Sequence, residues 1–509
     1  MTTSGISWQR RRLHPFVSIA FLVAFLSPSA AMAGEWAVRL QFSKHVHSTP
    51  YTGRVYVFFS RFSEEPRKGP DWFRPEPFVA KDVENWKSDQ PLTLSSSETN
   101  SLLSYPGPTA DFDPTGYRAQ AVVRFNRHER KVGTGVGNGY SQPVLFENSS
   151  EPLLLAVDRL VEEAPFVETE RIKLLRVRSK LLSDFHGRDV FLQAAVTLPP
   201  SYDASPERRY PTIFEVPGFG GTHRDVFKRA ADDGAPAGGV EFLHVLLDPS
   251  CPLGHHVFAD SANNGPVGTA LVTEFIPEFE RAYRAFAGGS ARFLTGHSSG
   301  GWSSLWLQVN YPEQFAGTWS TSPDSVDFRD YQRIDLYRPG ENMYFDAKGE
   351  RRPIARAGGQ VLLWYQDFAN MEETLGPGGQ LHSFEAVFSP RGDDGKPLLL
   401  WDRRTGKIDS AVAKTWQKYD NRLLLETNWK TLGPKLQGKL HVFMGGVDTF
   451  YLEGATMLLK QSLASLGSDA VVEIHADRTH GDLLTAELRQ RIRREMADAF
   501  LKSHPDYKK

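Results

Sequence analysis

A serine inside a glycine-rich turn is the strongest chemical signal in the chain. Residues 296–301 read GHSSGG, so Ser298 has a glycine two residues before it and another two residues after it. This G-x-S-x-G spacing is typical of a nucleophilic serine at an abrupt turn from a strand into a helix, where small neighbours relieve a crowded backbone. Apolar runs at 292–295 and 302–309 flank it, as such a turn requires. Ser298 is therefore the candidate nucleophile, and a simple Ser/Gly-rich turn is the alternative.

A serine hydroxyl needs a general base, and the base needs an acid that orients it. In chains with this motif the acid and then the histidine follow the serine in sequence. His480 lies in the polar loop 477–482, between the last predicted strand and the last predicted helix, and is the candidate base. His441 and His475 fall inside predicted strands, where a buried structural histidine is the expected role. The remaining downstream histidines are His382, in an irregular region, and His504, in the C-terminal tail.

Asp448 is the candidate acid. It follows the predicted strand 439–444 in the segment GGVD, which places its carboxylate at the same edge of the sheet as Ser298 and His480. A helix-capping or solvent-facing aspartate is the alternative. Other candidates are Asp477 and Asp482, which we interpret as turn residues, and Asp324, which follows an earlier strand.

Two backbone amides could stabilise an oxyanion at Ser298. One is the N–H of Ser299, and the other is the N–H of Phe219 in the loop 217–221, which reads PGFGG after a predicted strand. Because the loop lacks the Lys-Ser/Thr ending of a P-loop, phosphate binding is not expected there. His223, Trp302, Phe450 and Tyr451 flank these motifs and are candidates for lining a pocket, with core packing as the alternative for each.

No cofactor and no metal is expected. The neighbours His255 and His256, and the pair His475 and His480, do not have a metal-ligand spacing that we recognise. The lone Cys251 has no partner for an intramolecular disulfide and no evident activating base nearby in sequence.

Strands alternate with helices from residue 172 onward. We predict strands at 172–180, 190–198, 212–216, 242–247, 292–295, 318–322, 439–444 and 471–475, and helices at 270–286, 299–309, 455–466 and 483–502. This alternation favours a mostly parallel, doubly wound α/β sheet with helices on both faces. The stretch at about 329–435 breaks the rhythm and is predicted to be an insertion that could act as a lid.

The region before residue 172 is predicted to form short strands. Residues 35–42, 53–59, 116–125 and 153–161 are rich in Val, Tyr, Phe and Leu, with Pro- and Ser-rich stretches between them. We predict an all-β, sandwich-like accessory domain at 34–165 and a catalytic domain at 166–509. Nothing in the accessory domain looks catalytic, so a binding or spacing role is expected.

The N-terminus has the order of a secretory signal. Three arginines at 10–12 precede the apolar run 16–26, and the small-residue motif AMA at 31–33 follows. We predict a signal peptide at 1–33 and a secreted or periplasmic protein. An uncleaved anchor is the alternative, although eleven apolar residues are short of the roughly 20 that cross a bilayer. No later run is long enough, so no integral membrane segment is expected in the mature chain.

Composition excludes other classes of protein. Lys and Arg number 59 against 61 Asp and Glu, so the chain lacks the basic excess typical of nucleic-acid binders. Hydrophobic residues at 40% of 509 argue against a disordered chain, and the length allows more than one core.

From about residue 176 onward the chain resembles the putative-esterase (esterase D-like) branch of the α/β-hydrolases, which includes feruloyl esterases, enterochelin esterases and mycolyltransferases. The matching segments are VFLQAAVTLPPSY at 190–202, VPGFGG at 216–221, TEFIP at 273–277, FLTGHSSGGWSS at 293–304, SPDSVDF at 322–328, GGVDTFYLEG at 445–454 and RTHGD at 478–482. The resemblance implies an α/β-hydrolase fold and the triad Ser298, Asp448 and His480. The insertion departs from the family, so the resemblance implies no particular substrate.

These features predict a secreted serine hydrolase that cleaves carboxylic esters through an acyl-enzyme. Esters linked to polysaccharides suit an exported protein with many aromatic residues. The alternatives are an acyltransferase with the same triad, a non-catalytic glycan-binding protein and, less favoured, a peptidase.

Overall fold

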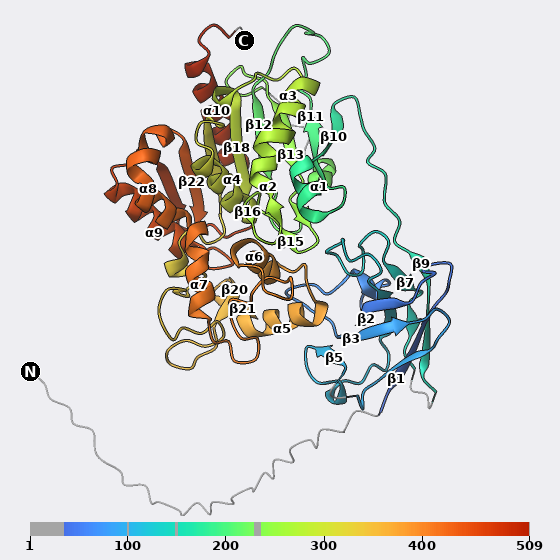
Figure 1. The fold of residues 1–509 in the computed structure, drawn as a ribbon. Helices are drawn as coiled ribbons and strands as arrows, with labels where there is room; N and C mark the ends of the chain where they lie inside the picture. The colour runs from blue at the N-terminus through green and yellow to red at the C-terminus, as the bar shows by residue number, and fades with distance from the viewer. Residues whose placement is uncertain (1–34, 99–100, 148–150, 229–235, 508–509) are drawn as a thin grey trace, which may run out of the picture.

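The computed structural model describes residues 35–98, 101–147, 151–228 and 236–507. Figure 1 shows an eight-stranded sheet with its helices at the top, a nine-stranded sheet at the lower right, and helices α5–α7 with a hairpin below the first sheet. The predicted signal peptide at 1–33 lies outside the described residues. Within the described ranges, none of the helices combines the length and apolar character needed to cross a bilayer.

The eight-stranded sheet has the predicted α/β character. Its order is β10-β11-β13-β12-β18-β19-β22-β23, and only the pairs β10–β11 and β11–β13 are antiparallel. The strands are β10 (Ile172–Arg178), β11 (Phe191–Thr197), β12 (Thr212–Val216), β13 (Leu243–Leu247), β18 (Arg292–His297), β19 (Gly317–Thr321), β22 (Leu440–Gly445) and β23 (Val471–His475). Central strands such as β12 and β18 are short and mostly buried, because a parallel strand buries both of its faces, whereas the edge strand β10 is partly exposed.

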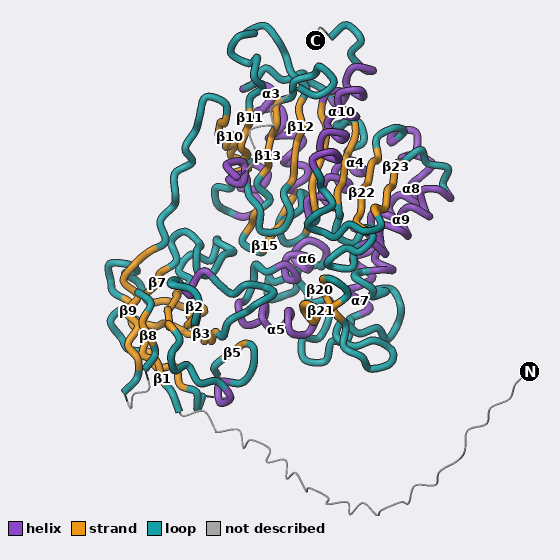
Figure 2. The backbone as a smooth tube through the Cα atoms, turned by 180° about the vertical axis from the view of Figure 1, so that it is seen from behind, coloured by secondary structure: helices purple, strands orange, loops and turns teal. Residues whose placement is uncertain are grey.

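Neighbouring residues along these strands point to opposite faces of the sheet and pack in different hydrophobic cores. Phe293 and Phe443 pack with α10 (Ala486–Ser503) on one face of the sheet. Leu294 and Val442 face the other side, where α4 (Ser299–Asn310), α8 (Asn421–Leu436) and α9 (Glu453–Ser465) pack together. Figure 2 shows the sheet between its two helical layers. Helix α8 falls inside the predicted insertion, yet it packs against α4.

The predicted helices at 299–309 and 455–466 lie within one or two residues of α4 and α9, whereas the other two differ more. The helix predicted at 270–286 is α2 (Val267–Ala270), a π-helical turn at Leu271–Phe275 and α3 (Ile276–Ala282), and it ends because Tyr283 adopts an extended backbone (φ −123°, ψ 156°). The last helix begins at Ala486 rather than at 483, because the Thr485 hydroxyl caps it by accepting the N–H of Leu488 at 3.2 Å.

The N-terminal strands form one sheet of order β4-β1-β9-β7-β6-β2-β3-β5, with β8 paired to β6. Its strands are β1 (Ala37–Phe42), β2 (Tyr51–Ser60), β3 (Phe78–Trp86), β4 (Leu92–Ser95), β5 (Leu103–Tyr105), β6 (Arg118–Val123), β7 (Gly139–Ser141), β8 (Val144–Leu145) and β9 (Leu153–Leu160). Strands from both ends of this path, such as β1 and β3, contribute to one core. The predicted sandwich, in which the sheet would close over that core, stays a prediction.

Between β19 and β22 the chain forms the hairpin β20 (Pro353–Ala357) and β21 (Gln360–Trp364), then α5 (Tyr365–Leu375), α6 (Gln380–Phe388), α7 (Ser410–Trp416) and α8. The N-terminal sheet holds the end of α5. Tyr56 Oη donates to the carbonyl of Leu375 at 2.6 Å, and Arg54 Nη1 donates to the carbonyl of Glu373 at 2.7 Å. Because the last carbonyls of a helix have no partner within it, these donors dock α5 onto the sheet.

Candidate active site

Ser298 stands at the turn between β18 and α4 with a left-handed backbone (φ 60°, ψ −126°). Such a conformation is strained by about 1–3 kcal/mol in a residue with a side chain. Close packing holds it: a Cβ on Gly300 would lie 1.9 Å from the carbonyl oxygen of Val216, and one on Gly296 would lie 2.1 Å from that of Gly300. Only glycine lets the start of α4 approach the end of β12 this closely.

His480 and Asp448 come together at the carboxyl edge of the sheet. His480 lies after β23, and its Nδ1 is 2.8 Å from Asp448 Oδ2. The other carboxylate oxygen, Oδ1, accepts the backbone N–H of Phe450 at 2.8 Å. Since a carboxylate oxygen only accepts, Nδ1 carries the proton and Nε2 is left with a lone pair. The buried carboxylate thus fixes both the tautomer and the orientation of the imidazole.

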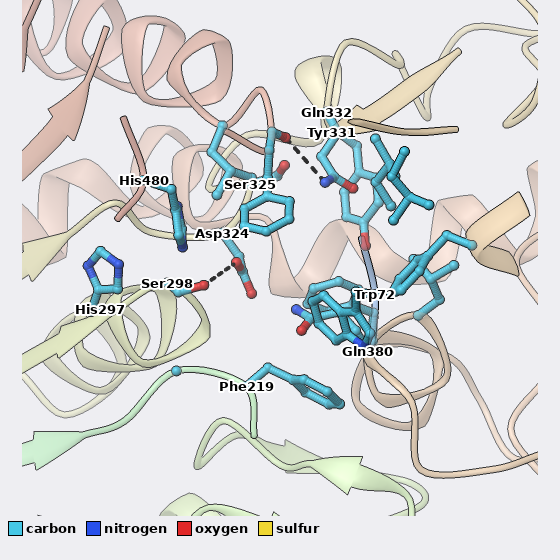
Figure 3. Close-up of a pocket in the computed structure, with 18 residues that line it drawn as sticks. Trp72, Phe219, His297, Ser298, Asp324, Ser325, Tyr331, Gln332, Gln380 and His480 are labelled. Carbon is cyan, nitrogen blue, oxygen red and sulfur yellow. Dashed lines mark hydrogen bonds between the residues drawn. The ribbon is translucent and has the colours of Figure 1, made fainter. Parts of the chain in front are cut away.

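Asp324 contacts the serines rather than His480. Ser298 Oγ donates to Asp324 Oδ1 at 3.4 Å (Figure 3). Ser299 Oγ donates to Asp324 Oδ2 at 2.5 Å. Burial raises the pKa of this carboxyl to about 6, while the Ser299 hydroxyl and the nearby His480 oppose the rise. Of the four aspartates weighed from the sequence, Asp448 is the one hydrogen-bonded to His480.

The glycine-rich loop after β12 lies against Ser298. A Cβ on Gly218 would be 3.2 Å from the Cβ of Ser298, so the loop backbone passes beside that side chain. Neither the N–H of Phe219 nor that of Ser299 donates to an acceptor among the described residues. Two unused N–H donors beside a serine can donate to an oxyanion and so stabilise the negative charge that develops on it.

A cavity of about 280 Å³ opens onto Ser298 and His480. Besides these two and His297, its polar walls are Asp324, Ser325, Gln332 and Gln380, and its larger apolar walls are Trp72, Phe219, Tyr331, Ile354, Leu363, Phe368, Leu381, Phe384, Phe450 and Leu452. Most of the apolar wall therefore comes from residues 331–384. Sequence reasoning missed these residues, since no local motif marks them.

Trp72 brings the N-terminal domain into this cavity. Its ring stacks with that of Phe219, with centroids 5.7 Å apart, and meets Phe368 edge-on at 4.9 Å. The sequence assigned this domain a binding or spacing role, and the only signal for Trp72 was a large aromatic side chain in a Pro-rich loop.

Residues 190–432 match the protein family described as "Putative esterase". This segment belongs to that esterase family. The resemblance stated from the sequence motifs is thereby confirmed, and the eight-stranded sheet is the mostly parallel sheet that it implied. No curated protein matches the chain.

Solved structures of esterases are similar only at a distance. An S-formylglutathione hydrolase from Agrobacterium tumefaciens is 16% identical with a TM-score of 0.39, covering 66% of this chain and 94% of that one. A CE1 ferulic acid esterase from Anaeromyces mucronatus is 13% identical with a TM-score of 0.32, covering 63% and 88%. A fluorophosphonate-binding serine hydrolase from Staphylococcus aureus is 12% identical with a TM-score of 0.37, covering 65% and 98%. At these TM-scores the similarities carry no argument about substrate.

Of the four pocket candidates named from the sequence, Phe450 lines the cavity and meets the His480 ring edge-on at 4.9 Å. Trp302 is a residue of α4 that is buried in the core, and Tyr451 is buried with Arg356 over its ring. His223 lies on the far side of the glycine-rich loop and pairs with Asp248 at 2.7 Å.

No group of three or more potential metal ligands occurs in the part of the chain that the structure describes.

Gly300→Ala tests the close packing under the serine. The added methyl would force α4 away from β12, and we expect a loss of about 3 kcal/mol of stability, seen as a lower melting temperature. Gly107→Ala is the control, since a Cβ there meets nothing within 4 Å. Equal melting temperatures for the two variants would contradict the packing.

Asp324→Asn tests the buried carboxyl. Its raised pKa means that the folded protein binds a proton between about pH 4 and 6 that the unfolded chain has lost, so stability falls as pH rises through that window. Above pH 6 the penalty is about 3 kcal/mol. The variant should therefore gain melting temperature relative to wild type at pH 8 and not at pH 4. The exposed Asp203→Asn is the control, and a gain that does not depend on pH would count against the buried carboxyl.

Proposed function

We propose that the chain is a secreted serine esterase that cleaves carboxylic esters through an acyl-enzyme, with Ser298, Asp448 and His480 as its triad. The observation that carries the proposal is the left-handed Ser298 at a strand–helix turn, sharing one cavity with a histidine bonded to a buried aspartate. Membership of residues 190–432 in the esterase family supports the reaction class.

In the proposed reaction, His480 Nε2 removes the proton of Ser298 as Oγ attacks the ester carbonyl carbon. The amides of Phe219 and Ser299 donate to the oxyanion of the tetrahedral intermediate. The intermediate collapses with loss of the alcohol, which takes the proton from His480. Water, deprotonated by His480, then attacks the acyl-enzyme and releases the acid and free Ser298.

Ser298 Oγ must turn toward His480 for this reaction, because its hydroxyl donates to Asp324 in the structure. In the proposed reaction, a rotation about the Cα–Cβ bond turns Oγ away from Asp324. The long 3.4 Å contact with Asp324 is a weak hydrogen bond, so little energy opposes the rotation.

The cavity favours an apolar or aromatic acyl group. Trp72, Phe219 and Phe368 offer ring faces and edges on its wall, and aromatic pairs contribute about 0.5–1.5 kcal/mol beyond area burial. A volume of about 280 Å³ suits one aromatic ring rather than a long chain. Together with the signal-like N-terminus, this supports an ester attached to a polysaccharide outside the cell.

The triad is tested by labelling with a fluorophosphonate and by hydrolysis of p-nitrophenyl acetate. Ser298→Ala should abolish labelling, and Ser298→Ala, His480→Ala and Asp448→Asn should each lower kcat by about a thousandfold or more with melting temperature retained. Ser325→Ala, in the same cavity, is the matched control.

Failure of wild type to label or hydrolyse would favour a non-catalytic glycan-binding protein. If Asp324→Asn lost more activity than Asp448→Asn, the acid would be misassigned. Ester product formed with an added alcohol acceptor would indicate an acyltransferase.

Trp72→Ala tests whether the N-terminal domain shapes specificity. Removing the indole from the cavity wall should lower kcat/KM for p-nitrophenyl benzoate about tenfold and change that for p-nitrophenyl acetate little, since acetyl is too small to reach it. Phe62→Ala, 89% exposed in the same domain, is the control. An equal loss for both esters would indicate a structural role for Trp72.

A further inference from the structure

A second and larger cavity, of about 820 Å³, lies on the other side of the glycine-rich loop. Its walls come from residues 128–136 and 162–164 beside the N-terminal sheet, and from α1 (Lys180–His186), β11 and residues 248–256 of the esterase part. Thr222 and His223 line it, whereas Gly218 and Phe219 of the same loop line the first cavity. Its volume is within the range of small-molecule sites.

Several cations in its wall lack an acidic partner. Among the described residues, no carboxylate lies within ion-pair distance of Arg130, Lys131, Arg176, Arg188 or Arg391. Arg188 donates to the carbonyl of Asp189 at 3.3 Å and Arg391 to that of Asn263 at 3.2 Å, and these contacts leave their charges uncompensated.

Most acids of the same wall are already paired. Asp248 pairs with His223 at 2.7 Å, Asp189 with Arg178 at 2.7 Å and Glu163 with Arg224 at 3.6 Å. Only Glu129 and Glu162 have no basic partner among the described residues, and burial raises the pKa of Glu129. A neutral imidazole does not cancel the charge of Asp248, so Asp248 counts with Glu129 and Glu162, and five unpaired cations against three acids still leave the wall positive.

Arg130 is the cation most in need of an anion. Its guanidinium lies over the ring of Phe219, 4.8 Å from the centroid, and within the described chain it donates no hydrogen bond. Burial lowers its pKa, which indicates that its charge is poorly solvated. Because a partly buried charge without a partner is unfavourable, and a guanidinium matches a carboxylate or phosphate in geometry, a bound oxyanion would offset this penalty.

We propose that this cavity binds a small organic anion, a polar molecule of one or two sugar rings that carries a carboxylate, sulfate or phosphate group. Arg130 and Lys131 hold the charged group, and Arg188 and Arg391 extend the positive wall. Polar side chains such as Gln193 and Asn264 face the rest of the ligand. The proposal requires no catalysis and is independent of the function proposed for Ser298.

Titration calorimetry of the full chain at constant ionic strength tests the site. The probes are D-glucuronate, D-glucose 6-sulfate and D-glucose 6-phosphate, with D-glucose as the neutral control. We expect at least one anion to bind with a Kd below about 1 mM and glucose not to bind. The anion with the lowest Kd identifies the charged group that the site prefers.

Arg130→Met and Arg188→Met should each weaken binding about tenfold or more, whereas the exposed Arg74→Met should not change it. Arg188 is exposed, so its variant is expected to fold even if Arg130→Met does not. Absence of binding by all three anions, equal binding of glucose, or unchanged affinity in Arg188→Met would overturn the proposal.

Discussion

The left-handed backbone of Ser298 is the constraint on which the rest of the site depends. It is held where the start of α4 meets the end of β12, a contact that Gly300 and Gly296 permit because neither has a side chain. The glycine-rich loop continues from the same end of β12 and so passes beside Ser298. One packing contact therefore fixes both the serine and the backbone amides next to it.

Asp448 and Asp324, the two carboxylates near Ser298, accept hydrogen bonds from different kinds of donor, and so they are suited to different roles. Asp448 accepts an imidazole N–H and a backbone N–H, one at each oxygen, and so can orient His480 rigidly. Asp324 accepts only hydroxyl groups, and burial raises its pKa to about 6. A carboxyl that changes protonation near pH 6 suits a variable contact with Ser298 better than permanent orientation of an imidazole.

The sheet could be predicted from the sequence because parallel strands buried on both faces appear as short apolar runs, and β12 matches its prediction at both ends. Helix ends depend on local backbone states, such as the extended Tyr283, that apolar periodicity does not encode. Ser298, Asp448 and His480 were predicted from motif and order along the chain, and the structure places them at one edge of the sheet. Trp72 was not, because its place in the cavity depends on packing between segments that are distant in sequence.

The N-terminal sheet and the helices after β19 form one support for the cavity. Arg54 and Tyr56 hold the carbonyls at the end of α5. Glu372, buried near that end, accepts the backbone N–H of Gln380 at 2.6 Å and so anchors the start of α6. The Gln380 amide in turn donates to the hydroxyl of Ser299 at 3.2 Å. This series of contacts runs from β2 to Ser299, the neighbour of Ser298, so the N-terminal sheet supports two helices that line the cavity, which is more than a spacing role requires.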